Sequence, residues 1–274
     1  MPDGSATTSA TEPGTLPTTP TTTITAPATI PHPTGADDVI VKVSYEGGLV
    51  APGYLFTAVP TLLISGDGRV FQPAPIPAVF PGPLLPSVSV RTITEAGIQA
   101  VLAILDHAGL LAPPPEYPDR HNVADGSTTV LTIQAAGGTF EHSAYALGMG
   151  GEPETGARQN LLDAVTRLSD IEASAGTANL GSSEPFVAVA YRLQARVVAP
   201  IEVANQDPPP TTVDWPLGGP VGIALRDVGD CARVDAAAVG TLFIDAKQNT
   251  YFREDDDVLY QLAVRGVLPG DPAC

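Results

Sequence analysis

The stretch TLLISGDGRVFQ, residues 61–72, decides the fold class of this chain. Two short runs of strand-forming residues flank Gly66-Asp67-Gly68, and Asp-Gly between two such runs is the strongest local signal for an antiparallel hairpin. Upstream, residues 39–46 alternate between mostly apolar and mostly polar positions, which predicts a half-buried strand. Downstream, residues 87–91 predict a further strand. This region is therefore expected to be antiparallel β-structure.

Helical spacing of apolar residues predicts three helices among the remaining strands. Thr94 can cap the first helix and Gly109 can end it. Since each helix precedes or follows antiparallel pairs, we expect an α+β fold with antiparallel sheet or sheets built from hairpins and about three helices packed on one face. The expected helices span residues 94–109, 155–172 and 235–246, and the further strands span 128–135, 139–145, 186–198, 221–225, 250–253 and 258–265.

The first 36 residues differ in composition from the rest of the chain. They contain twelve Thr and seven Pro but no Lys, Arg or Cys. Such a segment cannot bury enough apolar surface to offset the ordering of its backbone, so residues 1–36 are expected to be a disordered tail. The tail is either an inert terminus or an extended stalk that holds a domain away from a surface. Residues 37–274 are expected to form a single globular unit, with a sub-boundary near residues 205–213 where DPPPTT resembles a linker.

The two cysteines of the chain are Cys231 and Cys274. Since chain ends are usually exposed and frayed, a partner that holds the terminal cysteine is the simplest explanation for its position. A disulfide between the two would staple the C-terminal lobe and stabilise the fold by about 4 kcal/mol on the chain-entropy account. Such bonds persist in oxidising compartments, which would indicate an extracytoplasmic protein. Two unpaired thiols in a reducing compartment are the alternative.

The charge of the chain excludes several kinds of partner. Its formal net charge is −17 at pH 7, and no local cluster of Lys and Arg counteracts it. Nucleic acid and anionic membrane surfaces are therefore not expected to bind. No apolar run is long enough to span a bilayer, and we find no export segment ahead of the tail. An envelope protein, a glycan or a small molecule remains as the expected partner.

The motifs of common enzymes are absent from the sequence. We find no G-x-S-x-G, H-E-x-x-H, Walker or GxGxxG motif, and we assign no catalytic, cofactor-binding or metal residue. His121 lies near Asp119 and Asp125 in an expected loop, and His142 lies in an expected strand. A general base must lie within hydrogen-bond reach of its proton donor, and the sequence shows no such convergence. We therefore expect ordinary polar roles for both histidines.

Two further segments are open to a functional interpretation. Residues 254–257, EDDD, carry carboxylates, but Ca²⁺ takes six or more oxygen ligands and the EF-hand spacing is missing, so we expect a solvated hairpin tip. Residues 73–86 contain six Pro together with Phe80. We expect a long surface loop there, either packed rigidly on the sheet or exposing a Pro and aromatic strip that binds a partner.

Several strings resemble a group of uncharacterised actinobacterial exported proteins, many of them lipoproteins. At the end of the chain, the group's pattern has Pro where Gly266 stands, and this chain has no N-terminal cysteine to carry a lipid. The resemblance implies localisation at the cell envelope and a paired Cys274, and it implies no activity. The strings are LLISGDGRV (62–70), PGPLLP (81–86), RTITEAGIQ (91–99) and VRGVLPGDPAC (264–274).

These observations favour an extracytoplasmic module, secreted or attached to the cell envelope, that binds or interacts without catalysis and is carried on a Thr/Pro stalk. The alternative is an extracytoplasmic hydrolase whose polar residues converge only in the folded chain, with His121 or His142 as the base.

Overall fold

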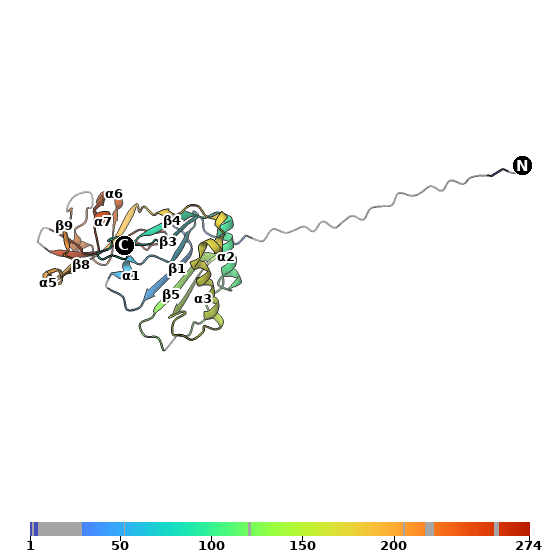
Figure 1. Ribbon diagram of the computed structural model, residues 1–274, viewed down its shortest axis with the longest axis horizontal. Helices are drawn as coiled ribbons and strands as arrows, with labels where there is room; N and C mark the ends of the chain where they lie inside the picture. Colours follow the sequence, from blue (N-terminus) through green and yellow to red (C-terminus); the bar gives the residue numbers. More distant parts are fainter. Residues whose placement is uncertain are drawn as a thin grey trace.

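The computed structural model describes residues 1, 3–4, 29–51, 53–119, 122–204, 206–216, 222–254 and 258–274. These residues form two β-sheets with short and long helices packed on them (Figure 1). The strands are β1 (Val39–Gly47), β2 (Leu62–Ser65), β3 (Arg69–Pro73), β4 (Val88–Thr92), β5 (Ser127–Ala135), β6 (Gly138–Tyr145), β7 (Glu184–Pro185), β8 (Ala190–Val198), β9 (Thr211–Asp214), β10 (Ala232–Asp235), β11 (Thr250–Arg253) and β12 (Leu259–Gly266). The α-helices are α1 (Tyr54–Thr57), α2 (Glu95–His107), α3 (Gly156–Ser169), α4 (Ile171–Ala175), α5 (Pro200–Ala204), α6 (Ala236–Val239) and α7 (Leu242–Asp245).

The first sheet has the strand order β6-β5-β1-β2-β3-β4-β7, and all of its neighbouring strands are antiparallel. Helices α2, α3 and α4 cover one face and enclose the larger apolar core with side chains from β1, β2 and β5. Figure 1 shows these helices on one side of the sheet and the second sheet on the other side. The predicted α+β fold, with antiparallel sheets built from hairpins, is therefore confirmed.

The three predicted helices differ in how well their ends were placed. In α2 the Thr94 hydroxyl accepts a hydrogen bond from the Gly97 N–H at 3.3 Å, as expected of a cap. The second predicted helix is instead divided into α3 and α4, because the Asp170 carboxylate accepts from the Ala173 N–H and starts a new helix. The third is divided into α6 and α7 at Gly240, whose φ of 56° ends the first of them.

The second sheet has the order β10-β8-β12-β11-β9 and packs against α6 and α7. Its edge strand β9 lies in the segment where we expected a linker, and it pairs parallel with β11. Only Val213 of this strand turns towards the core, so its sequence lacks the alternation that would have predicted it. The expected strand at residues 221–225 is also wrong, because the described part of it is a loop followed by a 3₁₀ turn at Leu225–Asp227.

Residues 267–274, here called the C-terminal strap, join the two sheets. Leu268 packs against Leu63 and Phe71 on the face of the first sheet that the helices leave open. The predicted disulfide between Cys231 and Cys274 is present and closes a loop of 43 residues. The C-terminal lobe is therefore stapled by a covalent bond, as expected.

Residues 29–36, here called the N-terminal strap, lie against the other end of the first sheet. The Ile30 N–H donates to the Gln99 amide oxygen at 2.8 Å, and the Ala136 N–H donates to the Pro31 carbonyl at 2.7 Å. Packing against the body thus begins several residues before the expected boundary at Asp37. Most of the expected tail, residues 5–28, lies outside the described residues. No helix in the described part of the chain is long and apolar enough to cross a membrane.

Candidate binding surface at one end of the first sheet

Three of the chain connections that leave the first sheet at one end, here called the connection end, lie against the second sheet. Strands β1, β3 and β7 run in the same direction, because a single antiparallel strand lies between each pair: β2 between β1 and β3, and β4 between β3 and β7. The β1–β2, β3–β4 and β7–β8 connections therefore all emerge where the second sheet packs.

These connections expose large apolar side chains. Leu49 retains 85%, Phe80 64% and Val187 83% of its accessible surface. Single exposed apolar residues are normal, whereas several of them on connections at one end of a sheet make that end a candidate interaction site. The exposed apolar residues of the three connections are Leu49, Val50, Tyr54, Leu55, Ile76, Val79, Phe80, Val187 and Val189.

The Pro-rich loop at residues 73–86 combines both of the expected arrangements. Its second half is held against the second sheet, where Leu84 and Leu85 pack into the core and the Leu84 N–H donates to the Ala246 carbonyl at 3.0 Å. Its first half turns Ile76, Val79 and Phe80 to solvent. The loop is therefore a strip that is anchored at one end and exposed at the other.

The β1–β2 connection contacts the face of the second sheet opposite to the one on which Leu84 packs. The Phe56 ring lies 5.5 Å from the Arg192 guanidinium, and the Phe56 carbonyl accepts from the Arg265 side chain at 3.1 Å. Burial, followed by the neighbouring Arg265 charge, lowers the pKa of Arg192. Since these arginines and the Leu84 side of the core lie on opposite faces of β8 and β12, the two connections hold the second sheet between them.

A polar groove of about 350 Å³ lies on that arginine-bearing face of the second sheet. Its floor comes from β8 and β12, and its walls come from Gly53 and Asp230. Gly53 belongs to the β1–β2 connection, so the groove borders the exposed apolar residues of that connection. The residues that line it are Gly53, Gln194, Ala195, Arg196, Asp230, Gln261, Leu262 and Ala263.

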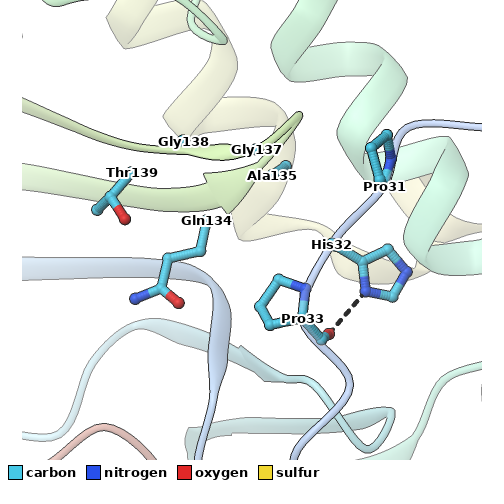
Figure 2. Close-up of a pocket in the computed structure, with 8 residues that line it drawn as sticks. All are labelled: Pro31, His32, Pro33, Gln134, Ala135, Gly137, Gly138 and Thr139. Atoms are coloured by element: carbon cyan, nitrogen blue, oxygen red, sulfur yellow. Dashed lines mark hydrogen bonds between the residues drawn. The ribbon is translucent and has the colours of Figure 1, made fainter.

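A second hollow, of about 470 Å³, lies at the other end of the first sheet (Figure 2). In Figure 2 the His32 ring is turned away from Gln134 and Thr139, and its Nδ1 is 2.8 Å from the Pro33 carbonyl. Its Nε2 lies 3.1 Å from a Glu95 carboxylate oxygen. No polar groups therefore converge in this hollow among the residues drawn, and we interpret it as the seam beneath the N-terminal strap. His32, expected in the tail, belongs to that strap.

His142 is fully buried and both of its ring nitrogens are engaged. Nε2 lies 2.9 Å from the Leu110 carbonyl and therefore carries the proton, so Nδ1 accepts from the Tyr117 hydroxyl at 2.7 Å. Burial lowers the pKa of His142, and the Leu110 carbonyl offsets only part of this effect. Burial likewise raises the pKa of Tyr117. An imidazole held in this way has no nitrogen free for a substrate.

The neighbours of His121 form a polar region beside α3, while His121 itself lies outside the described residues. Asp119 borders a hollow of about 490 Å³ whose base is a buried ion pair, Arg158 with Glu154, at 2.7 Å. Arg158 also donates to the Pro118 and Tyr145 carbonyls. The pair thus fastens two loops to α3. Its spacing of four residues was the only signal for it in the sequence.

The acidic run at residues 254–257 is not the solvated tip that we expected, at least at its first residue. Glu254 is buried, where its carboxylate accepts from the Leu225 N–H and lies 3.5 Å from Arg226. A backbone donor and a cation can stabilise a buried carboxylate, which explains the difference. Residues 255–257 lie outside the described part of the chain. Among the residues that are described, no group of His, Cys, Asp and Glu could hold a metal ion.

Comparisons with protein-family models, with curated protein sequences and with solved structures give no match for this chain. A function has therefore to be argued from the geometry of its own residues.

Proposed function

We propose that this chain is an extracytoplasmic, non-enzymatic interaction module whose connection end binds a protein partner at the cell envelope. The observation that carries the proposal is the set of nine exposed apolar side chains on three connections at one end of the first sheet. Two of these connections are fixed to the second sheet, so the apolar residues are presented on a rigid base and little conformational entropy is lost on binding.

The charge of the body indicates the chemistry of the partner. A protein with a net charge of −17 repels anionic lipid surfaces at long range, although its exposed apolar residues would otherwise suit a membrane. A partner with an apolar patch rimmed by Lys and Arg complements both features. We therefore commit to a protein surface of this kind.

Two features support a location outside the cytoplasm. The disulfide between Cys231 and Cys274 requires an oxidising compartment to persist. The Thr/Pro-rich composition of residues 1–36 is typical of stalks that hold a domain away from a surface. Intact mass of the protein from its native host, alkylated without reductant, should show no added alkyl groups; two alkylated thiols would contradict the location.

Site-specific photo-crosslinking tests the binding surface. A photoreactive residue at position 49 or 80 should give one discrete adduct in cells, and both positions should give the same partner. Position 201 is the matched control, because Ile201 is 69% exposed on α5 (Pro200–Ala204), and no hydrogen bond among the described residues joins α5 to the three connections.

The partner is then purified and its binding measured directly. Leu49→Ser and Phe80→Ser should each weaken binding at least about tenfold, whereas Ile201→Ser should leave it unchanged. Added salt should also weaken binding, because the acidic body faces a basic rim. Equal crosslinking at all three positions, or binding that both serine variants retain, would sink the proposal.

A further inference from the structure

The polar groove on the second sheet has a floor of four side chains in register. Gln261 lies opposite Arg196 and Ala263 lies opposite Gln194, so all four project from the same face of β8 and β12. Gly53, with φ of 78°, forms one wall so close to Ala263 that an added Cβ would lie 3.0 Å from the Ala263 Cβ. The groove is therefore a built feature in which two distant segments meet, rather than a gap left by a loop.

The hydrogen-bonding groups of the floor are oriented, and several of them have no protein partner. Arg196 donates to the Gln261 amide oxygen at 2.8 Å and to Glu202 of α5 at 3.0 Å. The Gln261 amide oxygen is thus fixed, and its NH₂ group is left to face the groove. Within the described residues, no hydrogen bond occupies the Gln194 amide or the Asp230 carboxylate, which supply further donors and acceptors.

The charges of the groove disfavour an anionic ligand. Arg196 is the only cation among the described residues that line the groove, and its guanidinium is already shared between Glu202 and Gln261. The Ala199 N–H, and after it Arg196, lower the pKa of Glu202, so this carboxylate stays ionised beside Arg196. Asp230 adds a second negative charge at the wall. An incoming carboxylate or phosphate would find no free cation among the described residues of this groove.

We propose that this groove binds a neutral oligosaccharide. A hydroxyl group donates and accepts at once, which matches a floor that offers amide NH₂ groups, an amide oxygen and a carboxylate. The Ala263 side chain, which lies on this face, can pack under the C–H face of a sugar ring, whereas Ala195 and Leu262 turn their side chains into the core on the other face of the sheet. The floor therefore has no deep pocket for a peptide side chain. This groove borders the exposed apolar side chains of the β1–β2 connection but shares no lining residue with the nine, and it gives the module a second ligand.

Saturation-transfer NMR on the full chain provides the test. The probes are short oligomers of glucose, mannose, arabinose, galactose and N-acetylglucosamine, with a galacturonate oligomer and an extended Ser/Ala peptide as competitors of other chemistry. At least one neutral series should bind. In a ¹H–¹⁵N correlation spectrum of the protein, the same oligomer should shift the backbone amide signals of Gly53 and Asp230. Binding of only the galacturonate or only the peptide would contradict the proposal, as would no neutral binding at about 10 mM.

Substitutions locate the binding. Gln194→Ala and Gln261→Ala should each weaken the association constant by about tenfold, since each removes the planar amide that pairs with hydroxyls. Gln159→Ala on α3 is the matched control and should change nothing. A double Gln194→Ala and Gln261→Ala variant that keeps its affinity would overturn the proposal. Crosslinking at positions 49 and 80 should persist in this variant, so the failure of one proposal is distinguishable from the failure of the other.

Discussion

The buried polar side chains of this protein are held by partners that are distant in sequence. His142 lies between Tyr117 and Leu110, and Arg265 lies between Phe56 and Asp271. A buried polar group costs free energy unless it is hydrogen-bonded, so each of these residues fixes the position of its partners. Strand alternation predicts that the His142 side chain points to the other face of its strand from Glu141 and Ser143. Only the fold shows that this face is the buried one.

The pH dependence of stability follows from the buried His142. Its folded pKa lies below the ordinary value of 6.5, so the unfolded chain takes up a proton that the folded protein refuses. The contribution of neutral His142 to the free energy of unfolding is fully present above pH 6.5. It is lost as the pH falls below that value, by up to about 1.4 kcal/mol per pH unit. Urea unfolding between about pH 7.5 and pH 5 measures this. His142→Gln should reduce the slope, whereas His107→Gln, an exposed control, should leave it unchanged.

The ion pair of Arg265 with Asp271 should stabilise the protein far more than an exposed pair. The two terminal nitrogens of Arg265, Nη1 and Nη2, each donate to the Asp271 carboxylate at 2.6 Å, and the Leu268 N–H donates to it as well. Asp271→Asn leaves a buried guanidinium without its counter-ion, which costs about 3–5 kcal/mol. Asp214→Asn, which alters the exposed pair with Arg253, should cost less than about 1 kcal/mol. Equal losses in denaturant unfolding would contradict this difference.

At the scale of the element, the sequence could predict those helices, strands and hairpins that depend on contacts between residues close together in the chain. The β5–β6 hairpin was predicted with its turn at Gly137-Gly138. The structure places the turn one residue earlier, at Ala136 and Gly137, whose φ values of 53° and 78° suit a tight hairpin. The pairing of β1 with β5 and of β8 with β12 is not local, so the division into two sheets could not be read from the sequence. The groove was missed for the same reason, because its walls and floor come from three distant segments.

The N-terminal strap is an element that contains no helix or strand, and Gly66 tests its contribution. A Cβ at residue 66 would lie 2.6 Å from the Gly35 carbonyl oxygen, so an added methyl group has to displace the strap. Gly66→Ala should therefore cost about 1–3 kcal/mol. Gly82→Ala is the control, because its Cβ would meet only the end of the Gln248 side chain at 3.3 Å.

The cost of Gly66→Ala should largely disappear in a variant that begins at Asp37, since the strap is then missing. Urea unfolding of the four proteins of this double-mutant cycle measures the coupling. An unchanged cost in the shortened chain would show that the strap is not what the methyl group displaces.

At the scale of the whole molecule, the two sheets are joined by several contacts of different kinds. The connections hold the second sheet from both faces, and the C-terminal strap crosses from one sheet to the other before it ends in the disulfide. The bond was predicted from the number and positions of the two cysteines, with two unpaired thiols as the alternative, and it is present in the structure. The role of Leu268 and Asp271 between the sheets could not be predicted, because it depends on β3 and β8 lying beneath them.

Removal of the disulfide should lower the free energy of unfolding without abolishing the fold. The loop of 43 residues that it closes corresponds to about 4 kcal/mol of chain entropy in the unfolded state. Cys231→Ser with Cys274→Ser should show this loss in denaturant unfolding while circular dichroism at neutral pH stays native, because Asp271 still anchors the strap. A loss close to zero would contradict the entropic account.

The N-terminal strap also determines how the folded body responds to force. It leads directly into β1, which lies inside the first sheet between β2 and β5 and is hydrogen-bonded on both sides. Tension applied through residue 29 therefore loads the hydrogen bonds of β1 along the strand, in shear, instead of peeling an edge strand away one bond at a time. The connection end lies at the opposite end of β1, so a partner bound there and a pull on the strap would stretch the sheet along its strands. Under such a load the lifetime of the fold depends on the unfolding rate rather than on the equilibrium stability.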